Sequence, residues 1–268
     1  MNLTRLFFYP VKSLAGIELQ AAVVDDFGIA MDRRWLVVDH QGNALTQRDY
    51  ARMVLIKPTL NEGGLRLEAP NSAPLLVGEP NGPQRQVRVW NDTMAAVDVG
   101  HEASDWLSSY LKAPARLVYM PDDTFRRVNP DYSPEQRRVS FTDGFPFLIV
   151  SQESMDELNR RLEEPMGIER FRPNLVVSGA PEAHAEDNWR AVRIGTMQFD
   201  LVKPCARCAV PTVDPLTAQK GKEPTRTLAT YRARDGKVYF GQNAIHEGPG
   251  TLRVGADVTL LEQANGAA

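Results

Sequence analysis

The clearest candidates for chemistry in this sequence are two cysteines, Cys205 and Cys208. They are the only cysteines of the chain, and they lie three positions apart in the segment Pro-Cys-Ala-Arg-Cys. This spacing is shared by zinc ribbons, by thioredoxin-like redox pairs and by metal sites in which a single thiolate is the ligand. Two thiols packed as small hydrophobic side chains are the alternative without chemistry. The spacing by itself leaves all four interpretations open.

The zinc and redox interpretations agree poorly with the rest of the sequence. A zinc ribbon needs a second pair of Cys or His ligands, but the histidines are scattered singly, as His40, His101, His184 and His246. A thioredoxin-like pair needs its first thiol at the N-terminus of a helix. Here a strand is expected before the thiols, and helix-breaking residues follow them, namely Pro211, Pro215 and Gly221. Both interpretations are therefore the weaker alternatives.

Three cations and one hydroxyl form a second group of candidates. Lys12 and Ser13 follow the first apolar run, Arg33 comes about twenty positions later, and Arg172 lies in the second half of the chain. Cationic side chains donate charge-assisted hydrogen bonds to phosphate oxygens, so together these residues could hold an anionic group. Taken singly, Lys12 and Arg33 are better interpreted as ordinary solvated surface residues.

The elements that must position these residues are mostly strands. Short runs rich in Val, Leu and aromatic residues are separated by Pro, Gly, Asn and Asp. They cover residues 3–9, 35–38, 65–68, 87–90, 116–120, 147–150, 175–178, 197–202, 238–240 and 258–261. Helical spacing of apolar residues occurs only in residues 103–112 and 152–162, the second with Ser151 as its expected N-cap. So few helices argue against a doubly wound sheet, and the sequence predicts a β-rich α+β protein.

Length and composition fit a folded protein of one large or two modest domains. The chain has 268 residues, 43% of them hydrophobic and 24% charged. The predicted join is where the first helix ends, which divides the chain into residues 1–113 and 114–268. A net charge of -3 differs from the strong positive charge expected of a nucleic-acid binder. No apolar run is long enough for a secretory signal or a membrane span, so we predict a cytoplasmic protein without membrane or nucleic-acid partners.

Taken together, short fragments along the chain resemble one known family. They read, in order, YPVKS, DRRW, FRPN, PCARC, VDP, EPTRTL, YR, FGQN and VGADV. Their order and spacing are similar to the MOSC family, named for the C-terminal domain of molybdenum cofactor sulfurase. The resemblance is strongest to the branch that contains the mitochondrial amidoxime-reducing component and its bacterial relatives. It covers nearly the whole chain and implies an N-terminal MOSC-type β domain followed by a MOSC β-barrel domain with a few helices.

The resemblance also implies the site and its cofactor, the molybdenum cofactor (molybdopterin). Cys208 matches the thiolate ligand of molybdenum, and Cys205 matches a supporting position. The positions that hold the pterin and its phosphate are matched by Lys12, Ser13, Arg33, Arg172 and Asn174, with Asn243 a weaker match. Ala206 stands where animal members have Ser: a contact made by the backbone N–H would be kept, whereas a contact made by the Ser hydroxyl would be missing here and would change the affinity for the cofactor. A thiolate is a soft ligand, which suits a metal already bound by sulfur.

The function that the resemblance implies is reduction of N-hydroxylated small molecules by a molybdenum-cofactor oxidoreductase. The alternatives are a carrier of the cofactor or of sulfur without turnover, and a β-rich binding protein without a metal. A [2Fe–2S] domain needs about four cysteine ligands, and no cysteine follows Cys208. We therefore expect a separate electron-donor protein of the flavoprotein or ferredoxin type. Asp214, just after the cysteines, could orient the loop, relay protons or simply form a turn.

Overall fold

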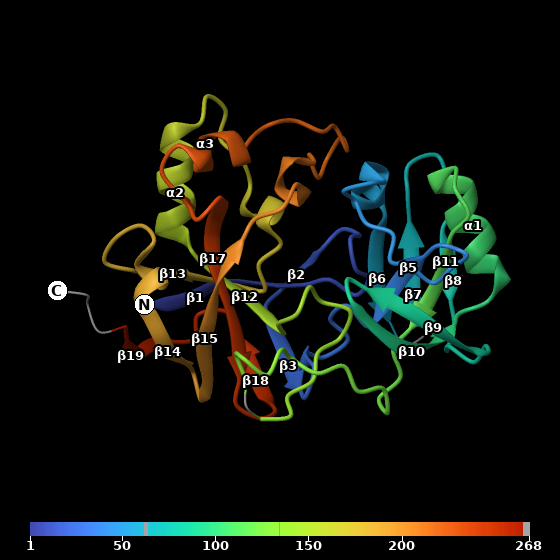
Figure 1. Cartoon of the computed structure of the whole chain (residues 1–268), viewed down its shortest axis with the longest axis horizontal. Helices are drawn as coiled ribbons and strands as arrows, with labels where there is room; N and C mark the ends of the chain where they lie inside the picture. The colour runs from blue at the N-terminus through green and yellow to red at the C-terminus, as the bar shows by residue number, and fades with distance from the viewer. Residues whose placement is uncertain (62–63, 134, 265–268) are drawn as a thin grey trace.

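The computed structural model describes residues 1–61, 64–133 and 135–264, and strands dominate it (Figure 1). The largest sheet has nine strands. Its spatial order is β19 (Val258–Gln263), β14 (Trp189–Ile194), β15 (Met197–Ala206), β17 (Lys237–His246), β12 (Phe147–Ser151), β13 (Leu175–Ser178), β1 (Asn2–Phe8) and β2 (Ile17–Leu19), with β16 (Ala233–Arg234) paired to β17 off this path. Only β12 and β13 run parallel among these described pairs. The predicted β-rich α+β class is confirmed.

Two further sheets form the other half of the molecule, on the right of Figure 1. One has the order β5 (Trp35–Val38), β11 (Arg116–Tyr119), β10 (Asp92–Asp98) and β9 (Gln84–Val89); the other has β6 (Lys57–Asn61), β7 (Gly64–Glu68) and β8 (Leu75–Val77). Helix α1 (His101–Leu111) buries Leu107, Tyr110 and Leu111 against this half, as its helical spacing predicts. The short 3-10 helix η1 (Ala51–Leu55) precedes β6.

The chain crosses between these halves more than once. A small sheet of β18 (Gly250–Arg253), β3 (Ala21–Asp25) and β4 (Gly28–Ile29) pairs the two ends of the sequence, and β1 pairs with β13 inside the large sheet. In turn β11, from the second part of the chain, pairs with β5. Hydrogen-bonded sheets thus span the predicted boundary between residues 1–113 and 114–268. The division of the chain into two domains at this boundary stays a prediction.

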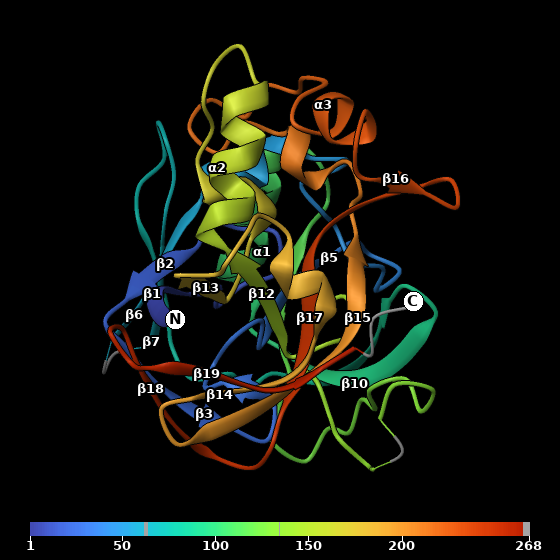
Figure 2. The same cartoon turned by 90° about the vertical axis from the view of Figure 1, so that its left-hand side faces the viewer.

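The remaining helices gather at one end of the large sheet. Figure 2 shows α2 (Gln152–Arg161) and α3 (Thr225–Ala229) together beyond β12 and β17. The Ser151 side chain accepts a hydrogen bond from the backbone N–H of Ser154, which confirms the predicted N-cap of α2. Three 3-10 helices complete the set: η2 (Ile168–Phe171), η3 (Ala185–Asn188) and η4 (Val210–Thr212). Across the described ranges, no helix has the length and apolar character needed to cross a membrane.

Candidate functional site

All eight residues predicted for the site line one cavity of about 120 Å³. They are Lys12, Ser13, Arg33, Arg172, Asn174, Ala206, Cys208 and Asn243. They come from the loop after β1, the loop before β5, the turn between η2 and β13, the end of β15 and its following loop, and β17. The fold thus brings together positions that are more than 200 residues apart in sequence. Their roles toward a cofactor stay predictions.

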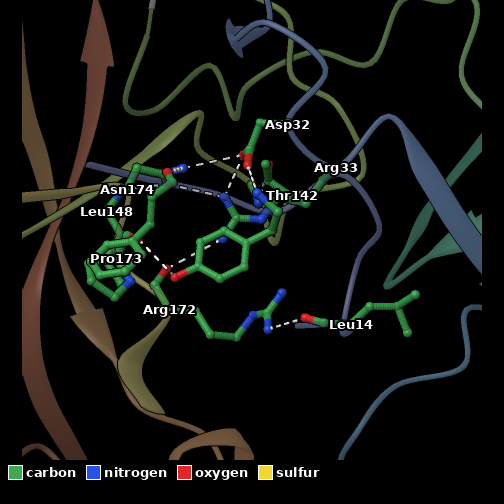
Figure 3. Close-up of polar contacts among 11 residues, drawn as sticks. Leu14, Asp32, Arg33, Thr142, Leu148, Arg172, Pro173 and Asn174 are labelled. Atoms are coloured by element: carbon green, nitrogen blue, oxygen red, sulfur yellow. Dashed lines mark hydrogen bonds and ion pairs between the residues drawn. The ribbon is translucent and has the colours of Figure 1, made fainter. Parts of the chain in front are cut away.

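Arg33 is paired with a buried acid, Asp32, which was not among the predicted site residues. Its Nη1 forms an ion pair with the buried Asp32 and also donates to Asn174 Oδ1 at 3.1 Å, as Figure 3 shows. The amide of Asn174 is further engaged, because Nδ2 donates to the Phe7 carbonyl at 3.2 Å and Oδ1 accepts from the Leu148 N–H at 3.3 Å. Burial raises the pKa of Asp32, and the nearby Arg33 partly offsets this effect. Asn174 is therefore a residue that positions Arg33 on the cavity wall.

Tyr9 lies beneath both arginines of the cavity. Its ring centroid is 4.3 Å from the Arg33 guanidinium carbon and 4.2 Å from that of Arg172. The hydroxyl donates to the Pro173 carbonyl at 3.0 Å, and burial raises the pKa of Tyr9, so the phenol stays neutral. A ring face attracts cations, which lets two guanidinium groups approach the same pocket. The only sequence signal for this role was the place of Tyr9 in the YPVKS fragment.

Arg172 offers the cavity a hydrogen-bond donor that the protein does not use. Its Nη1 donates to the Leu14 carbonyl at 2.6 Å (Figure 3), whereas Nη2 is buried and has no hydrogen-bond partner among the described residues. Burial lowers the pKa of Arg172 to about 10. The Nε of Arg48, also on the cavity wall, is buried and unpartnered in the same way. Leaving a buried donor unpaired costs about 1–3 kcal/mol, so these two donors favour an anion such as a phosphate in the cavity.

Lys12 reaches the cavity as a buried cation. Its side chain is 8% exposed, and its Nζ lies 2.5 Å from Oδ1 of Asp143. Burial lowers the pKa of Lys12 to about 8, although the charge of Asp143 opposes this effect. Asp143 also accepts a hydrogen bond from Trp90 Nε1 at 3.1 Å. Sequence reasoning missed Asp143, since an Asp-Gly pair between apolar runs is typical of an ordinary turn.

The two thiols have different surroundings. Cys205 Sγ lies 3.0 Å from Arg207 Nη1, and the residue packs against a core cluster that contains Phe171 and Phe240. Cys208 is a half-buried free thiol on the cavity wall. No cluster of three or more His, Cys, Asp or Glu side chains that could hold a metal occurs in the described part of the chain. A metal at Cys208 would therefore take its other ligands from a bound group, which fits a cofactor that brings its own sulfur atoms.

Two further interpretations can be compared with the geometry. β15 runs through Cys205 to Ala206 and is followed by the three-residue η4, so the first thiol does not begin an α-helix as a thioredoxin-like pair requires. Asp214 does not line the cavity. Its Oδ1 accepts from the Leu216 and Thr217 N–H groups at 2.8 and 2.9 Å, and its Oδ2 lies 2.5 Å from Arg170 Nη2. Asp214 thus closes a turn and holds the loop after the cysteines.

Comparison with known families identifies the fold. The model of the MOSC N-terminal beta barrel domain matches residues 1–114, and that of the MOSC domain matches residues 136–259. The chain belongs to the MOSC family. The MOSC domain is a molybdenum-cofactor-binding domain, so the predicted cofactor and the predicted family are both confirmed.

Individual relatives cover almost all of this MOSC protein. Mitochondrial amidoxime-reducing component 1 is 36% identical in both Mus musculus and Homo sapiens, over 98% of this chain and 83% of each relative. Among solved structures, the YUAD protein from Bacillus subtilis is 13% identical over 96% of this chain and 93% of its own, with a TM-score of 0.46. That score is too low to support an argument. The first two relatives confirm the predicted resemblance to the amidoxime-reducing branch.

The predicted cytoplasmic location of this MOSC protein is wrong. Relatives from mouse, human, Xenopus laevis and Danio rerio are all named mitochondrial, which contradicts that prediction. The prediction depended on a search for apolar signals. Mitochondrial transit peptides are amphipathic and rich in Arg and Ser, so a search for apolar runs does not test for that compartment.

Proposed function

We propose that this chain reduces N-hydroxylated small molecules with the molybdenum cofactor, taking the oxygen from an N–O bond. The observation that carries the proposal is the composition of one cavity, which is lined both by guanidinium donors without a described partner and by the Cys208 thiol. An anionic pterin phosphate and a soft metal need these two kinds of partner. The names of the amidoxime-reducing relatives support the choice of substrate class.

Each residue has a proposed role in holding the cofactor. Lys12, Ser13, Arg33 and Arg172 bind the phosphate and pterin, and Asn174 keeps Arg33 in place. Asn243 and the backbone N–H of Ala206 contribute polar contacts from β17 and β15. Cys208 is the thiolate ligand of the metal, and Cys205 supports the loop. The bound cofactor supplies the two-electron chemistry, while the protein supplies binding, orientation and electrostatics.

The overall reaction needs an electron source. Reduction of an N-hydroxy group to the amine or amidine consumes two electrons and two protons and releases water. We propose that a separate flavoprotein or ferredoxin-type protein delivers the electrons, because both thiols of this chain lie at the cavity. The alternative is a carrier that binds the cofactor and hands it on without turnover.

The test uses protein purified from a host that makes the cofactor. Molybdenum content is measured by elemental analysis, and reduction of benzamidoxime is followed with chemically reduced viologen, with NADH alone, and with NADH plus a flavoprotein or ferredoxin reductase. We expect molybdenum near one atom per chain, turnover with viologen and with the reconstituted donor, and none with NADH alone. Molybdenum without turnover under any condition, together with rapid transfer of cofactor to an apo-acceptor, would favour the carrier. Absence of molybdenum would refute both.

A further inference from the structure

A second hollow adjoins the cavity and has a different character. The two share the wall formed by Asp143, Gly144 and Phe145. The second hollow is rich in aromatic side chains, and two of them are unusually open to solvent: Trp90 is 53% exposed and Phe125 is 52% exposed. A Cβ atom built on Gly144 would meet nothing within 4 Å, so the shared wall is open at this position. The hollow and the cavity are therefore neighbouring spaces along one wall.

The charge available in the hollow is positive. Lys203 Nζ lies 4.4 Å from the ring centroid of Tyr132 and 6.0 Å from that of Phe145, and no described carboxylate forms an ion pair with it. The two acids of the hollow are already paired. Asp92 lies 2.8 Å from Arg126, and Asp143 lies 2.5 Å from Lys12. Lys203 is thus a cation held on aromatic rings, with its charge free for a ligand.

Lys203 is also tied directly to the cavity. It lies on β15, five residues before Cys208, and its carbonyl accepts a hydrogen bond from Asn243 Nδ2 at 3.2 Å. Asn243 lines the cavity, whereas the Lys203 side chain lines the hollow. One pair of neighbouring residues on β15 and β17 therefore reaches both spaces, which keeps the two at a constant separation.

Trp90, which lines the hollow, has a backbone conformation that is unfavourable for a bulky residue. Trp90 stands in the two-residue loop between β9 and β10 with φ of 58°, a left-handed conformation that bulky side chains rarely adopt. Its indole stacks 4.4 Å from the Arg48 guanidinium carbon and donates to Asp143. The surroundings thus hold an exposed aromatic ring of the hollow beside Asp143, which lines both spaces.

We propose that this hollow binds the distal part of the substrate and selects N-hydroxylated aromatic compounds that carry a carboxylate. This inference rests on the proposed reductase function. The rings contact the planar body of the substrate, and Lys203 forms a charge-assisted hydrogen bond with the carboxylate. A substrate with a cation at the same place meets the Lys203 charge and binds less tightly.

The test begins with binding alone. Calorimetry on the holoenzyme without an electron donor, where no turnover occurs, compares benzamidoxime with 4-carboxybenzamidoxime and with its 4-trimethylammonium analogue. We expect the carboxylate to bind about three- to tenfold more tightly than the neutral compound, the range for a partly exposed ion pair, and this preference to weaken in high salt. Lys203→Met should abolish the preference, and Lys203→Arg should retain most of it. Lys57→Met, an exposed lysine on β6, is the matched control and should change nothing.

A turnover arm separates the two proposals. With reduced viologen as donor, Lys203→Met should raise KM for the carboxylate about three- to tenfold relative to KM for benzamidoxime. Equal affinity of wild-type enzyme for the carboxylate and neutral compounds, or equal effects of the Lys203 and Lys57 variants, would overturn the selection by this hollow. Lys203-dependent binding without turnover of any compound would support the site and refute the reductase function instead.

Discussion

The ammonium group of Lys12 lies 2.5 Å from a carboxylate oxygen of Asp143, although 131 positions separate the two residues in the chain. This contact joins the loop after β1 to the loop before β12 at the wall of the cavity. Because Lys12 is buried, its pKa falls to about 8, within reach of ordinary assay conditions. The charge that the cavity offers to an anion therefore depends on pH.

Anion binding by the cofactor-free protein is predicted to weaken as the pH rises through about 8, where Lys12 loses its proton. Sulfate is the suitable probe, since its own charge is constant over this range. Its affinity, measured by calorimetry between pH 6.5 and 9.5, should fall in wild type and be low and nearly constant in Lys12→Met. The free energy of unfolding changes in the opposite direction. The folded pKa of about 8 is below the unfolded value of about 10.4, so the free energy of unfolding gains from Lys12 as the pH rises between them. A pH-independent sulfate affinity in wild type would contradict this prediction.

Loss of either cavity arginine is predicted to lower cofactor content. Each charge-assisted hydrogen bond contributes about 1.5 to 3 kcal/mol, which corresponds to about ten- to a hundredfold in affinity. Arg172→Met should have the larger effect on binding relative to its effect on folding, because the Arg172 Nη2 donor has no described protein partner to lose. Arg33→Met also leaves the buried Asp32 without its cation, so its melting temperature should fall as well. Unchanged molybdenum content in the double variant would refute the proposed pocket.

The two cysteines are predicted to differ in their response to substitution. Cys208→Ser should abolish activity with little change in melting temperature, since the thiol is half-buried on the cavity wall. Cys205→Ser should retain some activity and lose stability, because this thiol packs on the cluster around Phe171 and receives the Arg207 guanidinium. Activity with reduced viologen, molybdenum content and thermal unfolding are measured on both proteins. Equal activity in the two variants would refute the assignment of Cys208 as the ligand.

A buried carboxylate away from the cavity is predicted to control the acid side of the stability curve. Glu186 accepts hydrogen bonds from the hydroxyls of Ser151 and Ser154, both at 2.7 Å, and burial raises its pKa. The folded form thus favours the protonated acid. Its contribution to stability is fully present below the unfolded pKa of about 4.3 and is lost as the pH rises through the raised folded value.

Glu186→Gln tests this prediction because it keeps the shape and an acceptor but cannot ionise. Chemical unfolding at several pH values from 4 upward should show a smaller loss of stability in this variant than in wild type. Glu186→Ala should be less stable at all pH values by about 1–3 kcal/mol, since the Ser151 and Ser154 hydroxyls can then bond only to each other and one of them is left without an acceptor. Parallel pH curves for wild type and Glu186→Gln would mean that Glu186 is ionised at no net cost in the folded protein.

Much of the fold and of the candidate site was predictable from local sequence. All ten predicted strands overlap observed strands. A run of apolar and β-branched residues favours a buried strand, and this preference does not depend on which other strand pairs with it. Ser151 was predictable as a cap, since an N-cap bond is made within three residues. The eight predicted site residues all line one cavity. They could be predicted because each lies in a short fragment of characteristic sequence.

The partners of these elements were decided only by the tertiary structure. No local pattern indicates that β1 pairs with β13 or that β11 pairs with β5, since pairing depends on the packing of whole sheets. The same limit applies to the site. Tyr9, Asp143, Trp90 and Lys203 have their roles through contacts across the fold, which no spacing in the chain records. Charge and ring contacts act through space over a few ångströms, so only the folded chain determines which cations are neutralised by the protein and which remain for a ligand.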